Sequence, residues 1–123
     1  MTHDGARAFA DQWAAAWNRR DVEAVLAHFR DEVAFTSPSA LRVVGSATVQ
    51  GKQALRDYWN AALKRIGSLQ FAVDHVLWDA ERRELAIIYT ETLDGNSRRV
   101  SENLKFDAAG LVVSAEVFHG VPA

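Results

Sequence analysis

The sequence predicts an α+β fold in which helices come first and an antiparallel sheet follows. In three stretches of the first 66 residues, apolar side chains recur every three or four residues, as on one face of a helix. From residue 69 onward they recur every second residue, and short turn-forming connections join the segments, which places neighbouring strands antiparallel. We therefore expect residues 1–123 to form one domain with the helices on one face of the sheet.

Two helices and a short strand are expected before residue 38. The apolar face of the first helix consists of Phe9, Trp13, Ala16 and Trp17. Asn18-Arg19-Arg20 interrupts this pattern, and Asp21 is a suitable N-cap for a second helix. The buried side chains of that helix are expected to be Val22, Val25, Leu26 and Phe29. Val33–Thr36 is then typical of a strand, which Ser37-Pro38 ends.

The rest of the chain is expected to contain one more helix and four long strands. Residues 39–50 show no clear period and are expected to form a loop with some extended structure. The third helix is expected from Lys52 to Ile66, because Gly67 suits the position that follows a helix. The four strands are expected at Leu69–Trp78, Glu84–Leu93, Arg98–Asp107 and Leu111–His119. For the first two of them, the pattern does not determine which face points inward.

One carboxylate interrupts an apolar row of the third long strand. That row, which is expected to face the helices, consists of Val100, Glu102, Leu104 and Phe106. Glu102 is either a rim charge that pairs with an arginine such as Arg98, or a buried acid with a raised pKa. The second state suits a general acid/base or a neutral hydrogen-bond donor. Both interpretations stay open at this point.

Composition excludes several other kinds of site. The chain has no cysteine, so disulfides, thiolate metal sites and a cysteine nucleophile are excluded. The four histidines are scattered along the chain, and no metal site is predicted. A net charge of −2, with both signs interspersed, offers no basic surface for nucleic acid or an anionic membrane. No apolar run approaches the roughly 20 residues of a membrane span. The N-terminus lacks the regions of a signal peptide, so a cytoplasmic location is expected.

Several segments carry a resemblance to a known superfamily. They are Trp17–Asp21, Phe29–Pro38, Gln50–Lys52 followed by Tyr58-Trp59, and Leu104–Gly110, in that order along the chain. With them the sequence resembles the nuclear transport factor 2-like superfamily, and within it the SnoaL-like and ketosteroid-isomerase-like proteins. The resemblance implies a cone, in which three N-terminal helices pack into a strongly curved, mainly antiparallel sheet around a pocket.

The resemblance also implies partners and a kind of chemistry. Members of this superfamily commonly form homodimers through the outer sheet face, and the side chains that could provide that face here are Val112, Phe118, Ala86 and Ile88. The SnoaL-like and ketosteroid-isomerase-like enzymes carry out acid/base chemistry on small, mostly apolar molecules without a cofactor. We therefore expect a small apolar molecule as ligand and no cofactor.

Matching the chain to ketosteroid isomerase argues against the reaction of that enzyme in this protein. Its base, an aspartate immediately before a proline, corresponds to Ser37, which cannot shuttle a proton without a base of its own. Its oxyanion hole pairs a tyrosine with a protonated aspartate, and these positions hold Trp13 and Glu102. Two supporting tyrosines correspond to Phe29 and Trp59. Ketosteroid isomerisation is therefore not expected.

Two hypotheses for function remain. In the first, the protein is a cofactor-free acid/base enzyme with Glu102 as proton donor or base and His119 as its partner. The substrate pocket would consist of Trp13, Trp17, Phe29, Ser37, Trp59, Leu104 and Val117. The comparison also favours an inward direction for the last-strand row Val113, Ala115, Val117 and His119, which the pattern alone leaves open. In the second hypothesis, the same fold is a non-catalytic ligand-binding or dimerisation module.

Overall fold

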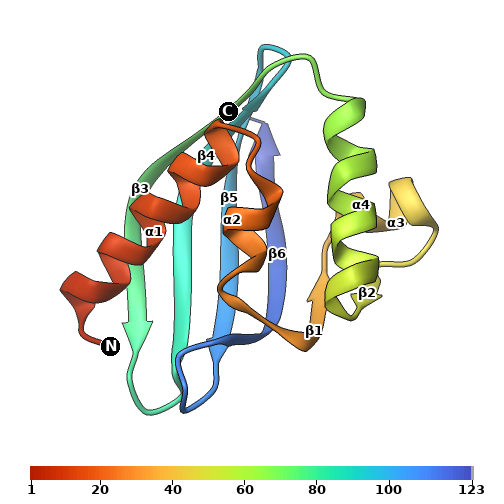
Figure 1. Cartoon of the computed structure of the whole chain (residues 1–123). Coiled ribbons are helices and arrows are strands. Elements are labelled where there is room, and N and C mark those ends of the chain that lie inside the picture. Colours follow the sequence, from red (N-terminus) through yellow and green to blue (C-terminus); the bar gives the residue numbers. More distant parts are fainter. Residues whose placement is uncertain (123) are drawn as a thin grey trace.

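The computed structural model describes residues 1–122. Four helices and six strands follow one another along the chain (Figure 1). The helices are α1 (His3–Asn18), α2 (Val22–Leu26), α3 (Pro38–Val44) and α4 (Lys52–Lys64). The strands are β1 (Phe29–Thr36), β2 (Thr48–Gln50), β3 (Leu69–Asp79), β4 (Glu84–Leu93), β5 (Asn96–Phe106) and β6 (Val112–Pro122).

One mixed sheet organises the molecule. Its strand order is β2-β1-β6-β5-β4-β3, and every neighbouring pair is antiparallel except β1 and β6, which run parallel. In Figure 1, α1 and α2 lie in front of the long strands, with α1 across β3 and β4, and α4 stands at the right beside β1. The predicted α+β cone is confirmed, with the three predicted helices present as α1, α2 and α4.

The helices present apolar faces to the sheet because of their residue spacing. In α1, the hydroxyl of Thr2 accepts a hydrogen bond from the Gly5 N–H at 3.0 Å and starts the helix, while Trp13 and Trp17 are buried. In α2, the predicted cap is confirmed, since the Asp21 carboxylate accepts from the Ala24 N–H. None of the helices of residues 1–122 has the length and apolar character that crossing a membrane requires.

The segment expected to be a loop contains a short helix and a short strand. Ser37 begins α3 by accepting a hydrogen bond from the Ser39 N–H at 3.2 Å, and Pro38 occupies the first helical turn, where its missing N–H costs nothing. Gly45, with φ of 78°, ends the helix. The pattern gave no sign of these elements because each is short and only Ala40 and Val49 are buried in them.

Two further boundaries differ from the prediction. Strand β1 begins at Phe29, four residues before the expected start, because Phe29 pairs with Val112 of β6. Helix α4 ends at Lys64 instead of Ile66. Beyond that end, the guanidinium of Arg20 donates to the carbonyls of Leu63, Ile66 and Gly67 at 2.9–3.1 Å, which satisfies groups that a longer helix would have bonded internally.

An irregularity in β6 corrects one predicted face. Phe106 pairs with Val112 and Lys105 pairs with Ser114, so Val113 is an extra residue in the ladder. Val112 is consequently fully buried, whereas the prediction placed it on the outer face and Val113 inside. From Ala115 onward the expected alternation holds, with Ala115 and Val117 buried and Phe118 exposed.

The structure also determines the inward faces that the sequence left open. On β4 the inward row is Leu85, Ile87, Tyr89 and Glu91, all buried. On β3 the register shifts between Val73 and His75, so the inward row changes from odd to even positions there. On β5 the expected inward row of Val100, Glu102, Leu104 and Phe106 is buried. Two glutamates, Glu91 and Glu102, therefore face the interior of the cone.

Candidate functional site

A cavity of about 100 Å³ lies inside the cone, between α4 and the sheet. Its walls come from α1, β1, α3, α4, β3, β5 and β6, together with residues beside them. The lining residues are Trp17, Phe35, Ser37, Ser39, Tyr58, Trp59, Ala62, Leu63, Ile66, Leu69, Phe71, Glu102 and Val117. The volume suits a few water molecules or a short apolar group.

The structure brings five of the predicted site residues to this cavity. They are Glu102, Trp17, Ser37, Trp59 and Val117. Trp13, Phe29 and Leu104 do not line it; they are at most 2% exposed and belong to the surrounding core. Phe71 and Leu69 line the cavity and were absent from the prediction, because the inward face of β3 could not be read from its residue pattern.

Glu102 is an uncharged acid at neutral pH in this environment. Its side chain is buried, with a residue exposure of 4%, and its Oε1 accepts a hydrogen bond from the Tyr89 hydroxyl at 3.2 Å. Burial raises the pKa of Glu102 to about 8; the Tyr89 hydrogen bond opposes this rise, and the charge of Glu91 adds to it. A carboxyl group in this state carries a proton that it can donate.

Aromatic packing holds Tyr89 in place. The ring is 1% exposed and lies between Trp13 and Phe71, with ring centroids 5.0 Å and 4.8 Å away. Burial raises the pKa of the Tyr89 hydroxyl well above its usual value, and the charges of Glu102 and Glu91 reinforce this. Tyr89 therefore stays protonated and donates to Glu102. Trp13, which the resemblance placed in the pocket, acts here as a support for this donor.

The second interior glutamate, Glu91, forms an ion pair. Arg98 Nε donates to Glu91 Oε1 at 2.6 Å, and the two side chains are 24% and 10% exposed. They face each other across the β4–β5 hairpin, where Asp94 and Gly95 both have positive φ and form a two-residue turn. Arg98 thus pairs with Glu91 and not with Glu102. The Asp-Gly pair could have fixed this register from the sequence, since it favours that tight turn.

The remaining polar groups at the cavity are mostly hydrogen-bond donors. The indole N–H of Trp17 is buried and has no hydrogen-bond partner among residues 1–122. Burial raises the pKa of the Tyr58 hydroxyl, which keeps its proton. The Ser37 hydroxyl, 3% exposed as a residue, accepts from the Ser39 N–H and also hydrogen-bonds the Tyr58 hydroxyl, which opposes the rise in the pKa of Tyr58. The cavity is therefore suited to a ligand with oxygen acceptors.

His119 lies outside the cavity lining. It sits on β6 opposite Val100, one inward position further along the strand than Val117. Burial, together with the charges of Arg98 and Arg42, lowers the pKa of His119 to about 4, so the imidazole is neutral at pH 7. Among residues 1–122 the side-chain partner of Glu102 is Tyr89, and no hydrogen bond joins Glu102 to His119. The structure thus places the two residues on adjacent strands, at diagonal positions of the same inward face.

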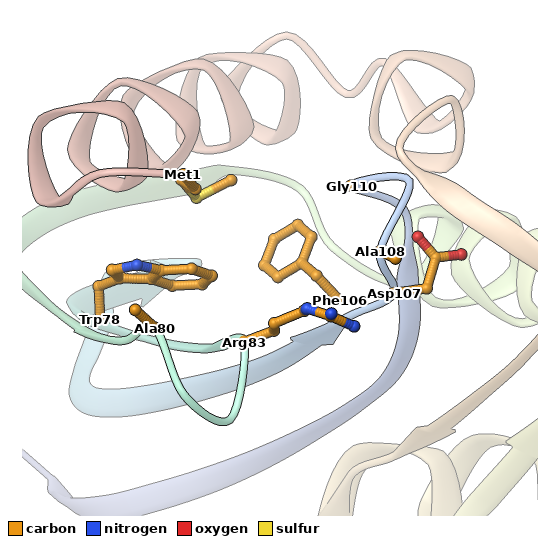
Figure 2. A pocket seen from close by; sticks show the side chains of 8 residues that line it. All are labelled: Met1, Trp78, Ala80, Arg83, Phe106, Asp107, Ala108 and Gly110. Atoms are coloured by element: carbon orange, nitrogen blue, oxygen red, sulfur yellow. The ribbon is translucent and has the colours of Figure 1, made fainter.

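A second hollow, of about 200 Å³, lies at the other end of the cone (Figure 2). The rings of Trp78 and Phe106 form its walls, with Met1 above them. Its carboxylate, Asp107, accepts from Arg30 at 2.6 Å and from two backbone N–H groups, which lower its pKa. Asp107 is thus a structural acceptor, and the acid/base candidate remains Glu102. No cluster of three or more possible metal ligands occurs within residues 1–122.

Comparisons with known proteins agree with this fold. A family model described as a SnoaL-like domain matches residues 10–113. A SnoaL-like protein of unknown function from Burkholderia thailandensis is 29% identical, with a TM-score of 0.87 and 97% of each chain covered. A protein of cystatin-like fold from Methylobium petroleophilum is 22% identical, with a TM-score of 0.79, covering all of this chain and 80% of the other.

A third similar structure was obtained with a small molecule. TerC, co-crystallised with polyporic acid, is 13% identical, with a TM-score of 0.76 and coverage of 94% of this chain and 92% of its own. At this identity the likeness shows a shared fold alone. A search of curated proteins finds no match to the chain.

Proposed function

This chain belongs to the SnoaL-like domain family, and we propose that it is a small-molecule pocket protein in which Glu102 donates a hydrogen bond or a proton to an oxygen of a small apolar ligand. The observation that carries this proposal is the buried Glu102 carboxyl, whose pKa of about 8 keeps it neutral at the wall of a mainly apolar cavity. TerC with polyporic acid supports it, as a protein of the same fold studied with a small molecule.

The chemistry that this arrangement supports is general acid catalysis without a cofactor. Tyr89 bonds one carboxyl oxygen of Glu102, which leaves the other oxygen to carry the transferable proton. Donation of that proton to a ligand carbonyl would stabilise the negative charge that develops on its oxygen. Isomerase, cyclase, dehydratase and hydrolase reactions all use such a step. In this proposal His119, a neutral imidazole one inward position beyond Val117, relays the returning proton to Glu102 through a water molecule.

One observation favours the alternative, a non-catalytic binding module. Among the lining residues, Glu102 is the sole carboxyl, and its only ionisable companion is Tyr58, whose pKa is raised by burial. A complete acid/base cycle at neutral pH commonly uses a second group to accept or return the proton. In the binding module, the neutral Glu102 would donate a hydrogen bond to the ligand without transferring the proton.

Both proposed functions require that the Glu102 carboxyl is neutral at pH 7, and a titration of Glu102 tests this. The side-chain carboxyl carbon of Glu102, assigned by comparison with Glu102→Gln, should titrate near pH 8 in an NMR experiment. A midpoint near 4.5 would refute the proposal, because the group would then be a carboxylate at pH 7. Native mass spectrometry of the purified protein would identify a retained ligand. Turnover of that ligand by the wild type and not by Glu102→Gln separates the enzyme from the binding module.

We also propose that the outer sheet face forms a homodimer. Leu77 of β3 and Phe118 of β6 are 59% and 52% exposed there, and the half-buried Ala86 and Ile88 of β4 lie between their strands. Association would remove this apolar surface from water. The proposed surface excludes Val112, which is buried in the core.

A further inference from the structure

An arginine lies at the rim of the Glu102 cavity. Arg42 is an exposed residue of α3, and its Nη2 donates to the Ser39 hydroxyl at 3.3 Å. Ser39 is itself a lining residue of the cavity. The guanidinium is therefore one hydrogen bond from the cavity wall, at the end of a flexible side chain that can turn toward a bound molecule. The charge of Arg42 also reaches Tyr58 on that wall, where it opposes the rise in pKa that burial causes.

The positive charge of Arg42 is not balanced by its surroundings. Arg98 is neutralised by Glu91 at 2.6 Å, and the acid inside the cavity, Glu102, is uncharged at neutral pH. His119 is neutral as well, since burial and the charges of Arg98 and Arg42 lower its pKa. Within residues 1–122, Arg42 forms no ion pair with a carboxylate, whereas Arg30 and Arg56 do. The rim consequently has an excess of one positive charge.

The donors inside the cavity point to the same class of ligand. The Trp17 indole N–H is buried without a partner among residues 1–122, and the Tyr58 hydroxyl keeps its proton. Neither group, nor a protonated Glu102, repels negative charge. The cavity volume of about 100 Å³ is smaller than the roughly 150 Å³ of an apolar cavity that holds benzene, so it takes a short apolar body or the inner part of a single ring. When the apolar part of a ligand fills this volume, the remaining groups of the ligand lie at the rim.

We propose that the natural ligand is a small organic anion, whose ring or short apolar body fills the cavity and whose carboxylate is held at the rim by Arg42. This inference rests on the proposed function and specifies the substrate class of the same site. The planar guanidinium offers two parallel N–H donors to a carboxylate, which favours a carboxylate over a neutral polar group of similar shape.

Benzoate and benzamide test the proposal, because they share a ring and a carbonyl oxygen and differ in charge. Binding is followed by NMR titration of the backbone amides and of the Trp17 indole N–H. Benzoate should bind about three- to tenfold more tightly than benzamide, as expected for an ion pair at a partly exposed site. Arg42→Gln should abolish that preference and leave the benzamide affinity unchanged. Arg82→Gln, at the exposed β3–β4 turn, makes the same charge change and should alter neither affinity.

The possible outcomes separate this inference from the proposed function. Equal binding of both probes, with shifts at Trp17, would overturn the anion preference and leave the pocket function intact. A benzoate preference that survives in Arg42→Gln would assign the anion site to another residue and overturn the assignment to Arg42. Failure of both probes to shift the Trp17 signal up to their solubility limits would overturn the ligand pocket and, with it, the anion inference.

Discussion

At the scale of single residues, Glu102 owes its properties to three neighbours with different effects. The apolar walls remove water and favour the protonated acid, and Glu91 adds the repulsion of a nearby negative charge. Tyr89 acts in the opposite direction, because its hydroxyl donates to Glu102 and stabilises the charged form. Desolvation is the largest of these effects, so the acid remains neutral at pH 7.

The Glu102→Gln variant should change how stability depends on pH. Since the pKa of Glu102 rises from 4.5 to about 8 on folding, the folded protein binds a proton that the unfolded chain releases in this interval. Stability therefore falls as pH rises from 4.5 to 8, by on the order of a few kcal/mol. Glu102→Gln should remove this fall, as measured by urea unfolding at several pH values. Glu116→Gln, an exposed change on β6, should retain the wild-type slope.

His119 should produce the opposite slope at lower pH. Its pKa falls from 6.5 to about 4 on folding, so folding releases a proton in this interval and stability rises with pH there. The two slopes oppose each other between about pH 4.5 and 6.5, and the Glu102 effect stands alone above that. A wild-type stability that kept rising between pH 7 and 8 would contradict the assignment of Glu102 as a buried acid.

The Tyr89→Phe variant should raise the pKa of Glu102 further. The substitution removes the hydroxyl that donates to Oε1 and leaves the ring that packs against Trp13 and Phe71. A loss of about 1 kcal/mol in unfolding free energy is expected from one hydrogen bond. Carboxyl NMR measures the pKa, and Tyr58→Phe is the control, because Tyr58 lines the cavity without bonding Glu102. An unchanged or lower pKa in Tyr89→Phe would show that the hydrogen bond does not form in solution.

At the scale of elements, single irregular residues decide which side chains reach the interior. The extra residue in β6 buries Val112, and a register shift in β3 changes the inward row between Val73 and His75. Both lie in long strands whose residue pattern shows no break. Elsewhere the cone is closed by contacts from turns, such as Arg20 at the end of α4.

Val112 and Val113 should respond differently to the same substitution. Val112 is fully buried and Val113 is only partly buried, although they are adjacent and identical in type. Val112→Ala should cost about 2 kcal/mol, whereas Val113→Ala should stay within about 0.5 kcal/mol of the wild type. Chemical denaturation of the two variants measures both. Equal costs would indicate that the extra residue in β6 is at another position.

Arg20→Asn should loosen the end of α4. Arg20 has φ of 60°, a conformation that asparagine tolerates, so the substitution removes the guanidinium without adding backbone strain. Loss of its three bonds to carbonyl groups should cost about 1–2 kcal/mol. Faster amide hydrogen exchange is expected near Ile66, on the cavity wall. Arg19→Asn is the control, because Arg19 makes only an exposed 3.5 Å contact with Asp21; the same acceleration there would exclude the Arg20 bonds as its cause.

At the scale of the whole molecule, the sequence was sufficient to predict the fold class and the inward-pointing side chain of Glu102. The regular alternation of β5 predicted its buried row, and motifs spread over the chain predicted the cone. The cavity itself was predicted only in part. Phe71 and Leu69 line it because β3 directs its odd-numbered side chains inward before the register shift at Val73, which the residue pattern does not show. Predicting the Glu91–Arg98 ion pair requires the register of the β4–β5 hairpin. Predicting the lowered pKa of His119 requires the position of α3, which carries Arg42.

The proposed dimer gives a prediction at the same scale. Phe118→Glu places a charge in the middle of the outer sheet face and should yield monomers in analytical ultracentrifugation, with little effect on the core because Phe118 is 52% exposed. Leu41→Glu is the matched control, since Leu41 is 56% exposed but lies on α3, away from this face. A sedimentation coefficient that is the same in the wild type and Phe118→Glu would argue against this surface.

The parallel pairing of β1 with β6 has a consequence for how the chain acquires its structure. β6 is last along the chain yet lies between β1 and β5 in the sheet. On a ribosome, residues 112–122 must leave the exit tunnel before β1 and β2 can join the β3–β5 meander. Until then an open edge of β5 is exposed, a state that invites aggregation. We expect closure by β6 to be the slow step of folding, since it joins segments about 80 residues apart.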